Sequence, residues 1–263
     1  MMLLYGVVCA QEPDDAQLAP KKSLISEEFP GNSWTFFAGE QNVPVSKTWK
    51  VETDPSTNTP VLVCTGEPYG YIRTRTGYQE FELNLEWKYP QDQNGNSGIL
   101  LFTSGDDRIW PDSLQVQLHH STAGSTFPSG SAKSNNELRN VPALSRPVGQ
   151  WNECKVISRN GRITVFVNEK KIGEVTGCEP NMGTIALQSE GSEIHFRELW
   201  IREFSGTESA NSRTSLIRPG RFHGATRYCR SSVPPMHSWW ESTDCEIFRV
   251  RSGFPIALQY RHQ

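Results

Sequence analysis

Two stretches of alternating polar and apolar residues carry the side chains best suited to chemistry. In residues 81–88 and 114–119 every second residue is apolar, which is the period of a half-buried β-strand. The side chains on the two polar faces are carboxylates, amides and an imidazole: Glu82, Asn84, Glu86, Gln115, Gln117 and His119. We expect the two strands to be neighbours, so that these groups form one polar surface over an apolar layer. Such a surface suits the binding of a carbohydrate.

The acidic residues of the first stretch are spaced like those of one class of glycosidase. Glu82, Asn84 and Glu86 are close to the Glu-x-Asp-x-Glu pattern of retaining family 16 enzymes, except that Asn84 stands where that pattern has Asp. Cα atoms four residues apart on a strand lie ~13 Å from each other. The carboxyl groups of a retaining pair are only about 5 to 5.5 Å apart. A solvated outward face is therefore the competing interpretation.

Other residues near the second stretch could bind or react with a sugar. His119 is a candidate general base or ligand, and a surface or hydrogen-bonded histidine is the alternative. His120 points the opposite way on a strand, so both histidines cannot serve one site. Trp110 could stack on a sugar ring or pack in the core. Asp106 and Asp107 could bind a cation, although two acidic residues in a turn often only form the turn.

Further acidic and aromatic residues lie at predicted turns. Gly191 marks a turn between Glu190 and Glu193 that could bring carboxylates to the rim of such a site, and Tyr69 could stack on a sugar. The chain has no Ser nucleophile elbow, no P-loop, no dinucleotide fingerprint and no H-E-x-x-H motif. A net charge of -3 argues against a nucleic-acid partner. These observations exclude nucleotide and hydride chemistry.

The six cysteines contain no C-x-x-C pair, so a zinc site is not expected. Cys154 and Cys178 could form a disulfide in an oxidising compartment. We favour buried free thiols.

The spacing of apolar residues predicts an all-β protein. Short alternating runs recur through the central part of the chain, and no long run has a helical period. This pattern favours a sandwich or jelly roll of antiparallel sheets, with an up-and-down barrel as the alternative. The dipeptide Asn160-Gly161 between two alternating runs is a strong hairpin signal. Residues 124–147 break the pattern, and we expect a long loop that forms one wall of the site.

Composition divides the 263 residues into four parts. Residues 1–10 are interpreted as a signal peptide, although no basic residue precedes the apolar run, and a frayed N-terminus is the alternative. Residues 11–26 are predicted to be a linker and residues 27–205 the β domain. Residues 206–263 hold eight Arg, no Lys and four acidic residues, which indicates a low-order tail rather than a small subdomain. The expected location is periplasmic or extracellular, with no transmembrane span, since spanning takes about 20 apolar residues.

An ordered set of short motifs carries a family resemblance: Trp49-Lys50-Val51-Glu52, Cys64-Thr65-Gly66, Gly70-Tyr71-Ile72-Arg73-Thr74, residues 81–87, Asn96-Ser97-Gly98-Ile99-Leu100-Leu101, Trp110-Pro111, Gln117-Leu118, Trp151-Asn152-Glu153 and Leu187-Gln188-Ser189-Glu190-Gly191. Together they resemble the 3-keto-disaccharide hydrolase domain family over residues 27–204. The resemblance implies a concanavalin-like jelly roll and an exported hydrolase of 3-keto-glycosides, with an acid/base site on the concave sheet. A ketone at C3 acidifies the hydrogen at C2, so the glycosidic bond can break by elimination and water can then add.

This chemistry needs a base, an acid, and donors or a divalent cation that hold the enolate. On the resemblance, Glu86 and His119 are the acid/base candidates, and either Arg73 or Arg197 stabilises charge. The residues expected to bind substrate are Arg73, Asn96, Trp110, Gln115, Gln117, Gln188 and Arg197. Related sequences usually have Glu where this chain has Gln115. The alternative function is therefore a non-catalytic, lectin-like carbohydrate-binding module.

Overall fold

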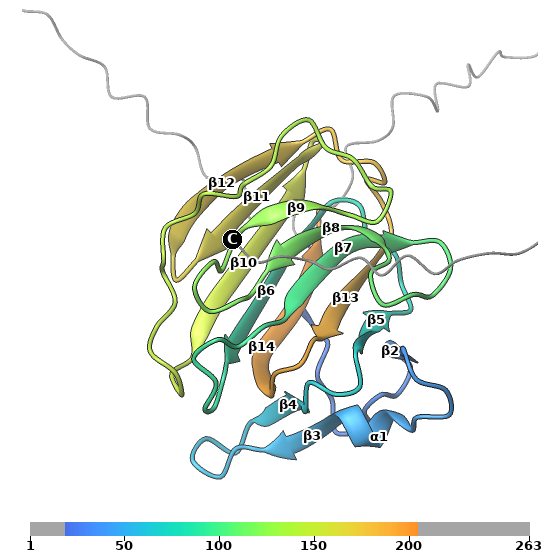
Figure 1. Cartoon of the computed structure of the whole chain (residues 1–263), viewed down its shortest axis with the longest axis vertical. Coiled ribbons are helices and arrows are strands. Elements are labelled where there is room, and N and C mark those ends of the chain that lie inside the picture. The colour runs from blue at the N-terminus through green and yellow to red at the C-terminus, as the bar shows by residue number, and fades with distance from the viewer. Residues whose placement is uncertain (1–18, 205–263) are drawn as a thin grey trace, which may run out of the picture. The chain divides into compact units, whose positions relative to one another are not determined.

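Residues 19–204 are described by a computed structural model, in which fourteen strands form two antiparallel sheets with one short helix, α1 (Val45–Thr48) (Figure 1). The eight-stranded sheet has, in spatial order, β12 (Lys170–Thr176), β11 (Arg162–Val167), β10 (Asn152–Arg159), β6 (Phe81–Lys88), β14 (Ile194–Glu203), β4 (Pro60–Cys64) and β3 (Trp49–Thr53), with β1 (Lys22–Ser23) paired to β14. The six-stranded sheet has β2 (Trp34–Ala38), β5 (Gly70–Thr74), β13 (Thr184–Ser189), β7 (Gly98–Ser104), β8 (Asp112–Gln117) and β9 (Thr126–Ser129). The predicted all-β jelly-roll sandwich is confirmed.

The core lies between the two sheets and is built by alternation along the strands. Leu83 and Leu85 of β6 belong to the same buried cluster as Leu114 and Val116 of β8. Complete burial of such a side chain contributes about 1.5 to 3 kcal/mol. Because successive residues of a strand point to opposite faces, the remaining side chains of both strands project to the outer faces of the sandwich.

Two tight turns set the register of β10, β11 and β12. Asn160 and Gly161 have φ of 52° and 71°, as a type I′ hairpin requires, and they join β10 to β11. Asn168 and Glu169 repeat this conformation between β11 and β12, with φ of 47° and 68°. The hairpin predicted at Asn160-Gly161 is confirmed.

Two segments are more ordered than their composition predicts. Residues 124–147 contain the edge strand β9, and Leu138 pairs with Thr126 in an isolated bridge. The alternating run of β9 is too short to be recognised in the sequence. Pro128 also argues against a strand there, because proline within a sheet is confined mainly to edge strands such as β9. The C-terminal part of the predicted linker 11–26 belongs to the folded domain, because β1 pairs with β14 and Leu24 is buried.

The remaining predictions for the chain ends concern residues outside the described range: the signal peptide at 1–10, the linker up to residue 18, and the tail at 206–263. Within residues 19–204, no helix is long and apolar enough to cross a membrane. Cys64, Cys154 and Cys178 are buried free thiols in this part of the chain, as we favoured. Burial raises the pKa of the Cys154 thiol to about 12.

Candidate functional site

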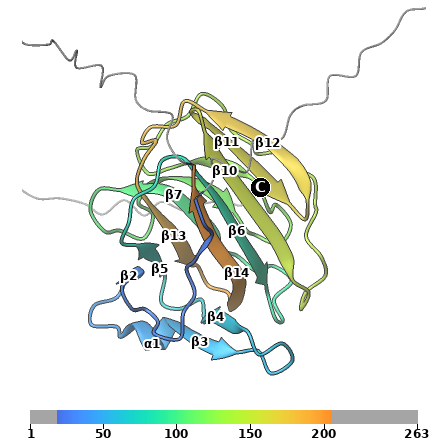
Figure 2. The ribbon, with the colours of Figure 1, turned by 180° about the vertical axis from the view of Figure 1, so that it is seen from behind.

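The two polar faces singled out in the sequence lie on opposite surfaces of the sandwich. β6 belongs to the eight-stranded sheet and β8 to the six-stranded sheet (Figures 1 and 2). Their apolar residues belong to one core cluster between the sheets. Glu86 on β6 therefore projects away from Gln115 and Gln117 on β8. The expectation of one shared polar surface is wrong. Alternation fixes the residues that share a face of one strand, but not the sheet that the strand joins.

On the outer face of the eight-stranded sheet, the acidic residues of β6 are paired with arginines of β14. Glu86 Oε2 accepts a 2.5 Å hydrogen bond from Arg197 Nε, and Glu82 Oε2 accepts one of 2.6 Å from Arg202 Nε. The Arg197 guanidinium also lies 4.3 Å from the centre of the Trp151 ring. Glu86 and Arg197 thus contact each other, on the surface opposite the amides with which they were predicted to act.

The outer face of the six-stranded sheet gathers the predicted amides. Gln115 Nε2 donates to Gln117 Oε1 at 2.6 Å, and Gln117 Nε2 donates to Asn96 Oδ1 at 3.2 Å. On β7, Gly98 pairs with Gln117 of the neighbouring strand β8. On the other side of β7, Ile99 pairs with Leu187 of β13, so Gln188 lies beside Gly98. We call Asn96, Gln115, Gln117 and Gln188 the amide row. Their side chains were predicted to bind substrate, and the structure brings all four together.

Gly98 lets the Gln188 and Gln115 side chains lie directly against the backbone at the centre of the amide row. A Cβ atom at this position would lie 2.2 Å from Gln188 Oε1 and 3.2 Å from Gln115 Nε2. Gln188 Oε1 is buried and has no hydrogen-bond partner among the described residues. A buried acceptor without a partner costs free energy. This atom is therefore suited to accept a hydrogen bond from a ligand.

His119 extends the amide row at the end of β8. Hydrogen bonds from Leu118 N to Ser97 O and from His120 N to Gly95 O continue the pairing with the segment before β7, which places His119 opposite Asn96. Leu118 is in the core, so His119 projects to the outer face. Its Nδ1 atom lies 3.0 Å from the Ser121 hydroxyl. His119 therefore shares a face with the amides, but not with Glu86.

Sequence reasoning singled out Glu190 only as a turn acid, and the structure gives it the most unusual environment on this face. Glu190 Oε1 accepts a 3.3 Å hydrogen bond from Trp110 Nε1, while Oε2 is buried and has no partner among residues 19–204. Burial raises the pKa of the Glu190 carboxyl, and the Trp110 hydrogen bond only partly opposes this shift. The signal that could have found it is the motif Gln188-Ser189-Glu190-Gly191, since alternation puts Glu190 on the side of Gln188.

The loop between β7 and β8, residues 105–111, folds back over the outer face of the six-stranded sheet. Asp107 Oδ1 accepts a 2.6 Å hydrogen bond from the Tyr71 hydroxyl and lies 3.2 Å from Arg73 Nη1, both on β5. Trp110 on the same loop is 53% exposed, so it does not pack in the core and stays available for stacking. In the described part of the chain, no three His, Cys, Asp or Glu side chains gather as potential metal ligands.

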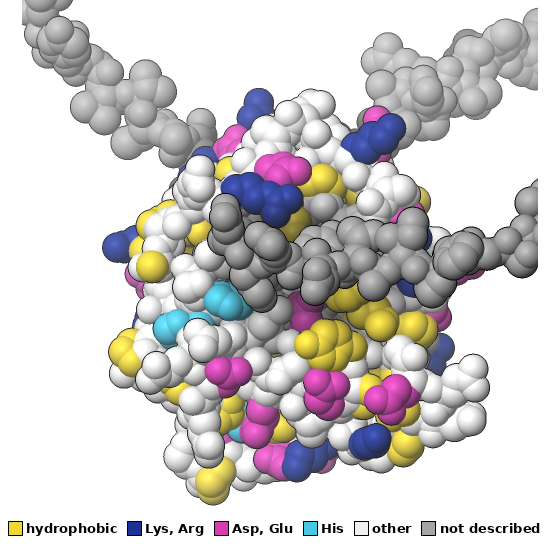
Figure 3. Space-filling model, viewed as in Figure 1, with side chains coloured by type: hydrophobic (Ala, Val, Ile, Leu, Met, Phe, Trp, Pro, Cys, Tyr) yellow, Lys and Arg dark blue, Asp and Glu magenta, His cyan; other side chains and the backbone are white. Residues whose placement is uncertain are grey.

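Figure 3 shows the side of the molecule that carries β7 to β9. Basic side chains are scattered among acidic and hydrophobic ones on this side, and they do not form a broad patch. The described surface on this side is therefore mixed in charge.

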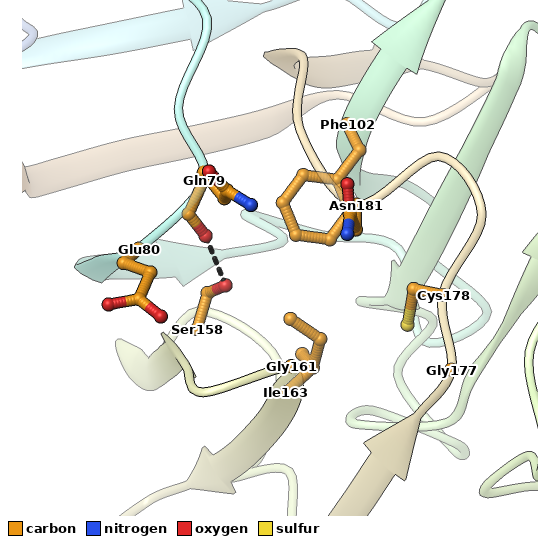
Figure 4. A pocket seen from close by; sticks show the side chains of 9 residues that line it. All are labelled: Gln79, Glu80, Phe102, Ser158, Gly161, Ile163, Gly177, Cys178 and Asn181. Carbon is orange, nitrogen blue, oxygen red and sulfur yellow. Dashed lines mark hydrogen bonds between the residues drawn. The ribbon is translucent and has the colours of Figure 1, made fainter. Parts of the chain in front are cut away.

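A cavity of about 200 Å³ lies elsewhere in the sandwich, between β6, β7, β10 and β11 and the segment that follows β12 (Figure 4). Phe102 and Ile163 line it beside the Cys178 thiol, whose pKa burial raises to about 11. At its edge the Ser158 hydroxyl donates to the backbone oxygen of Gln79 at 2.5 Å. The cavity shares no residue with the amide row, and its thiol is less acidic than an ordinary cysteine.

Comparisons with known proteins agree with this architecture. A family model described as "3-keto-alpha-glucoside-1,2-lyase-like domain" matches residues 26–202. A 3-keto-disaccharide hydrolase of Bacteroides thetaiotaomicron is 20% identical, over 48% of this chain and 59% of that protein. The match thus covers less than two thirds of that relative.

Solved structures of sugar-active proteins are similar as well. One is a candidate glycosyl hydrolase of Parabacteroides distasonis, with 20% identity, 65% of this chain and 88% of that chain covered, and a TM-score of 0.49. Another is the β-glucanase of Bacillus licheniformis, with 12% identity, 70% and 96% covered, and a TM-score of 0.46. Because the family model covers nearly all of the described sandwich, this chain belongs to the family of 3-keto-alpha-glucoside-1,2-lyase-like domains.

Proposed function

We propose that this domain cleaves glycosides whose sugar carries a ketone at C3, on the outer face of the six-stranded sheet, with Glu190 as the proton-transferring group. The observation that carries the proposal is the carboxyl of Glu190, which is held by Trp110, has one buried oxygen without a partner in residues 19–204, and has a raised pKa. Acids whose pKa is shifted by burial cluster at catalytic sites. Family membership supplies the substrate class.

The reaction follows from the acidity of the hydrogen at C2. A base removes this proton, and the electron pair forms an enolate with the C3 carbonyl. The enolate then expels the glycosidic oxygen from C1, which takes up a proton and leaves as an alcohol. Water adds across the resulting C1–C2 double bond, so that elimination followed by addition amounts to hydrolysis. The lyase and hydrolase names of the family and of its curated relative fit these two halves.

Glu190 is suited to protonate the leaving oxygen. A carboxyl whose pKa is raised keeps its proton at a higher pH than an ordinary glutamate, and can therefore donate it under mild conditions. After donation, the carboxylate can accept a proton from the water that adds in the second half. Trp110 holds the carboxyl in place through Oε1, and the buried Oε2 has no partner among residues 19–204.

The neighbouring residues are suited to the other roles. His119, on the same face, is the base candidate for the C2 proton. The amide row supplies donors and acceptors for sugar hydroxyls, and Gly98 lets the Gln188 amide lie close against the sheet. Glu86 and Arg197 take no part in this proposal, because they lie on the opposite surface. Export, inferred from residues 1–10, also stays a proposal, which N-terminal sequencing of the secreted protein would test.

A second candidate function is carbohydrate binding without turnover. Gln115 favours it, since this amide cannot transfer a proton and stands where the family resemblance leads us to expect Glu. Wild-type protein that binds a 3-keto-glucoside and releases no product would support this module and overturn the enzyme.

The proposal is tested by turnover of a 3-keto-glucoside, with Glu190→Gln and a matched control, Glu193→Gln. Glu193 is a nearby exposed acid that bonds to His195 of β14. We expect Glu190→Gln to lower kcat by about 10²- to 10⁴-fold, the contribution of a general acid, while substrate binding persists. Glu193→Gln should match wild type. Equal activity of wild type and Glu190→Gln would rule out the assigned role.

A further inference from the structure

We propose that Asp107 is a positioning residue, which latches the β7–β8 loop onto β5 and so keeps Trp110 against Glu190. The inference rests on the proposed function for its catalytic meaning, but the latch itself is a statement about the loop. It assigns a role to an acidic residue that the sequence marked only as a turn or a possible cation ligand.

Two donors converge on one oxygen of Asp107. The Tyr71 hydroxyl and Arg73 Nη1 lie 2.6 Å and 3.2 Å from Asp107 Oδ1. Tyr71 is completely buried, and Arg73 follows it by two residues on the same face of β5. Hydrogen bonds to a charged acceptor are shorter and stronger than those between neutral groups. The loop is therefore attached to the sheet through one hydrogen bond and one ion pair, at an Asp107 side chain that is 43% exposed.

The position of Trp110 depends on this attachment. Trp110 is 53% exposed, yet its indole N–H reaches Glu190. Between Asp107 and Trp110, Ile109 packs closely on Gly39, where a Cβ atom would lie 2.9 Å from Ile109 Cδ1. Beyond Trp110, Asp112 pairs with Arg108 and accepts a 2.6 Å hydrogen bond from Ser131 N. The loop is thus held by Asp112 where it enters β8, and by Asp107 where it crosses β5.

Release of the latch should be visible in the titration of Glu190. Burial is the larger influence and raises the pKa of this carboxyl, whereas the Trp110 hydrogen bond lowers it. A loop that swings away removes both influences, so the net effect is a fall in the pKa. The other ionisable groups here are Tyr89 and Asp92: burial raises the pKa of Tyr89 well above its usual value, and the charges of Glu190 and Asp92 raise it further. Neither belongs to the loop, so their effects stay constant.

The test measures the titration of the Glu190 carboxyl carbon by ¹³C NMR, with its signal assigned through Glu190→Gln. We expect Asp107→Ala to lower the pKa of Glu190, and Asp107→Glu to restore it in part. Asp106→Ala is the matched control, since Asp106 lies in the same loop and has no hydrogen bond or ion pair with any residue in 19–204. If Asp107→Ala does not fold, Asp107→Asn keeps the shape and removes the charge.

A double-mutant cycle separates the latch from a general loss of stability. If Asp107 acts through Trp110, adding Asp107→Ala to Trp110→Ala changes the pKa of Glu190 and kcat no further. Additive effects, or an unchanged titration in Asp107→Ala, overturn the latch even if Glu190→Gln abolishes turnover. If Asp107→Ala shifts the pKa of Glu190 but the wild-type protein shows no turnover, the role of Asp107 in holding the loop is supported and the proposed enzymatic function is refuted.

Discussion

Gly98 lies so close to Gln188 that a Cβ atom on the glycine would stand 2.2 Å from Gln188 Oε1. Gly98→Ala must therefore push the Gln188 side chain into the space that we assign to the sugar. We expect at least a tenfold loss of sugar affinity, which calorimetry would measure, and a stability cost of about 1 to 3 kcal/mol from overpacking. Gly77→Ala is the control, because its Cβ would meet nothing nearer than 3.5 Å. Unchanged sugar affinity in Gly98→Ala would show that the amide row does not bind the sugar.

Gln188→Leu separates binding from stability. Gln188 Oε1 is buried without a partner in the described structure, so an apolar side chain of similar size removes an unsatisfied acceptor. We expect thermal unfolding to show equal or higher stability, by up to about 1 to 3 kcal/mol, together with a loss of sugar affinity. Gln117→Leu should instead destabilise the protein, since Gln117 bonds to both of its amide neighbours. A less stable Gln188→Leu protein that binds normally would mean that Gln188 is structural.

Glu190 should make stability depend on pH in a defined direction. Its pKa is raised in the folded protein, so the folded state binds its proton more tightly than the unfolded state. The stability from this group is complete below the unfolded pKa and is lost as the pH rises through the folded pKa. Glu190→Gln should therefore match wild type near pH 3.5 and gain stability relative to it at pH 8. Urea unfolding at both pH values tests this, and an equal difference at both would contradict it.

Gln115→Glu asks whether the amide row can take the acid that the family resemblance leads us to expect at this position. Gln115 is only 6% exposed, and its Nε2 donates to Gln117 Oε1. A carboxylate at position 115 cannot donate, so the Gln117 amide would have to rotate by about 180° and present its Nε2 as the donor. We expect a gain in turnover of a 3-keto-glucoside if the face is catalytic. Burial should also raise the pKa of the new acid, which makes the variant less stable as the pH rises. No gain in rate, with normal sugar binding, would favour the binding module.

The sequence predicted local structure well, and contacts between distant segments poorly. Alternation placed Gln115 and Gln117 on one face, and the Asn160-Gly161 signal located a hairpin, because both depend on neighbouring residues. The bond between Trp110 and Glu190 joins residues 80 apart through a loop that folds over a sheet, and no periodicity predicts such a path. Similar alternation in β6 and β8 could not show that the two strands belong to different sheets.

Glu86→Gln tests this separation of the two faces directly. Glu86 bonds to Arg197 on the outer face of the eight-stranded sheet, and the core lies between this pair and the amide row. The side chains of this pair are 28% and 23% exposed, so the loss of its charge should cost at most about 1 kcal/mol of stability. Turnover and sugar affinity should stay within about twofold of wild type, because a screened charge beyond the core has little effect on the site. A large loss of kcat in a folded Glu86→Gln protein would return catalysis to the eight-stranded sheet and refute the site at Glu190.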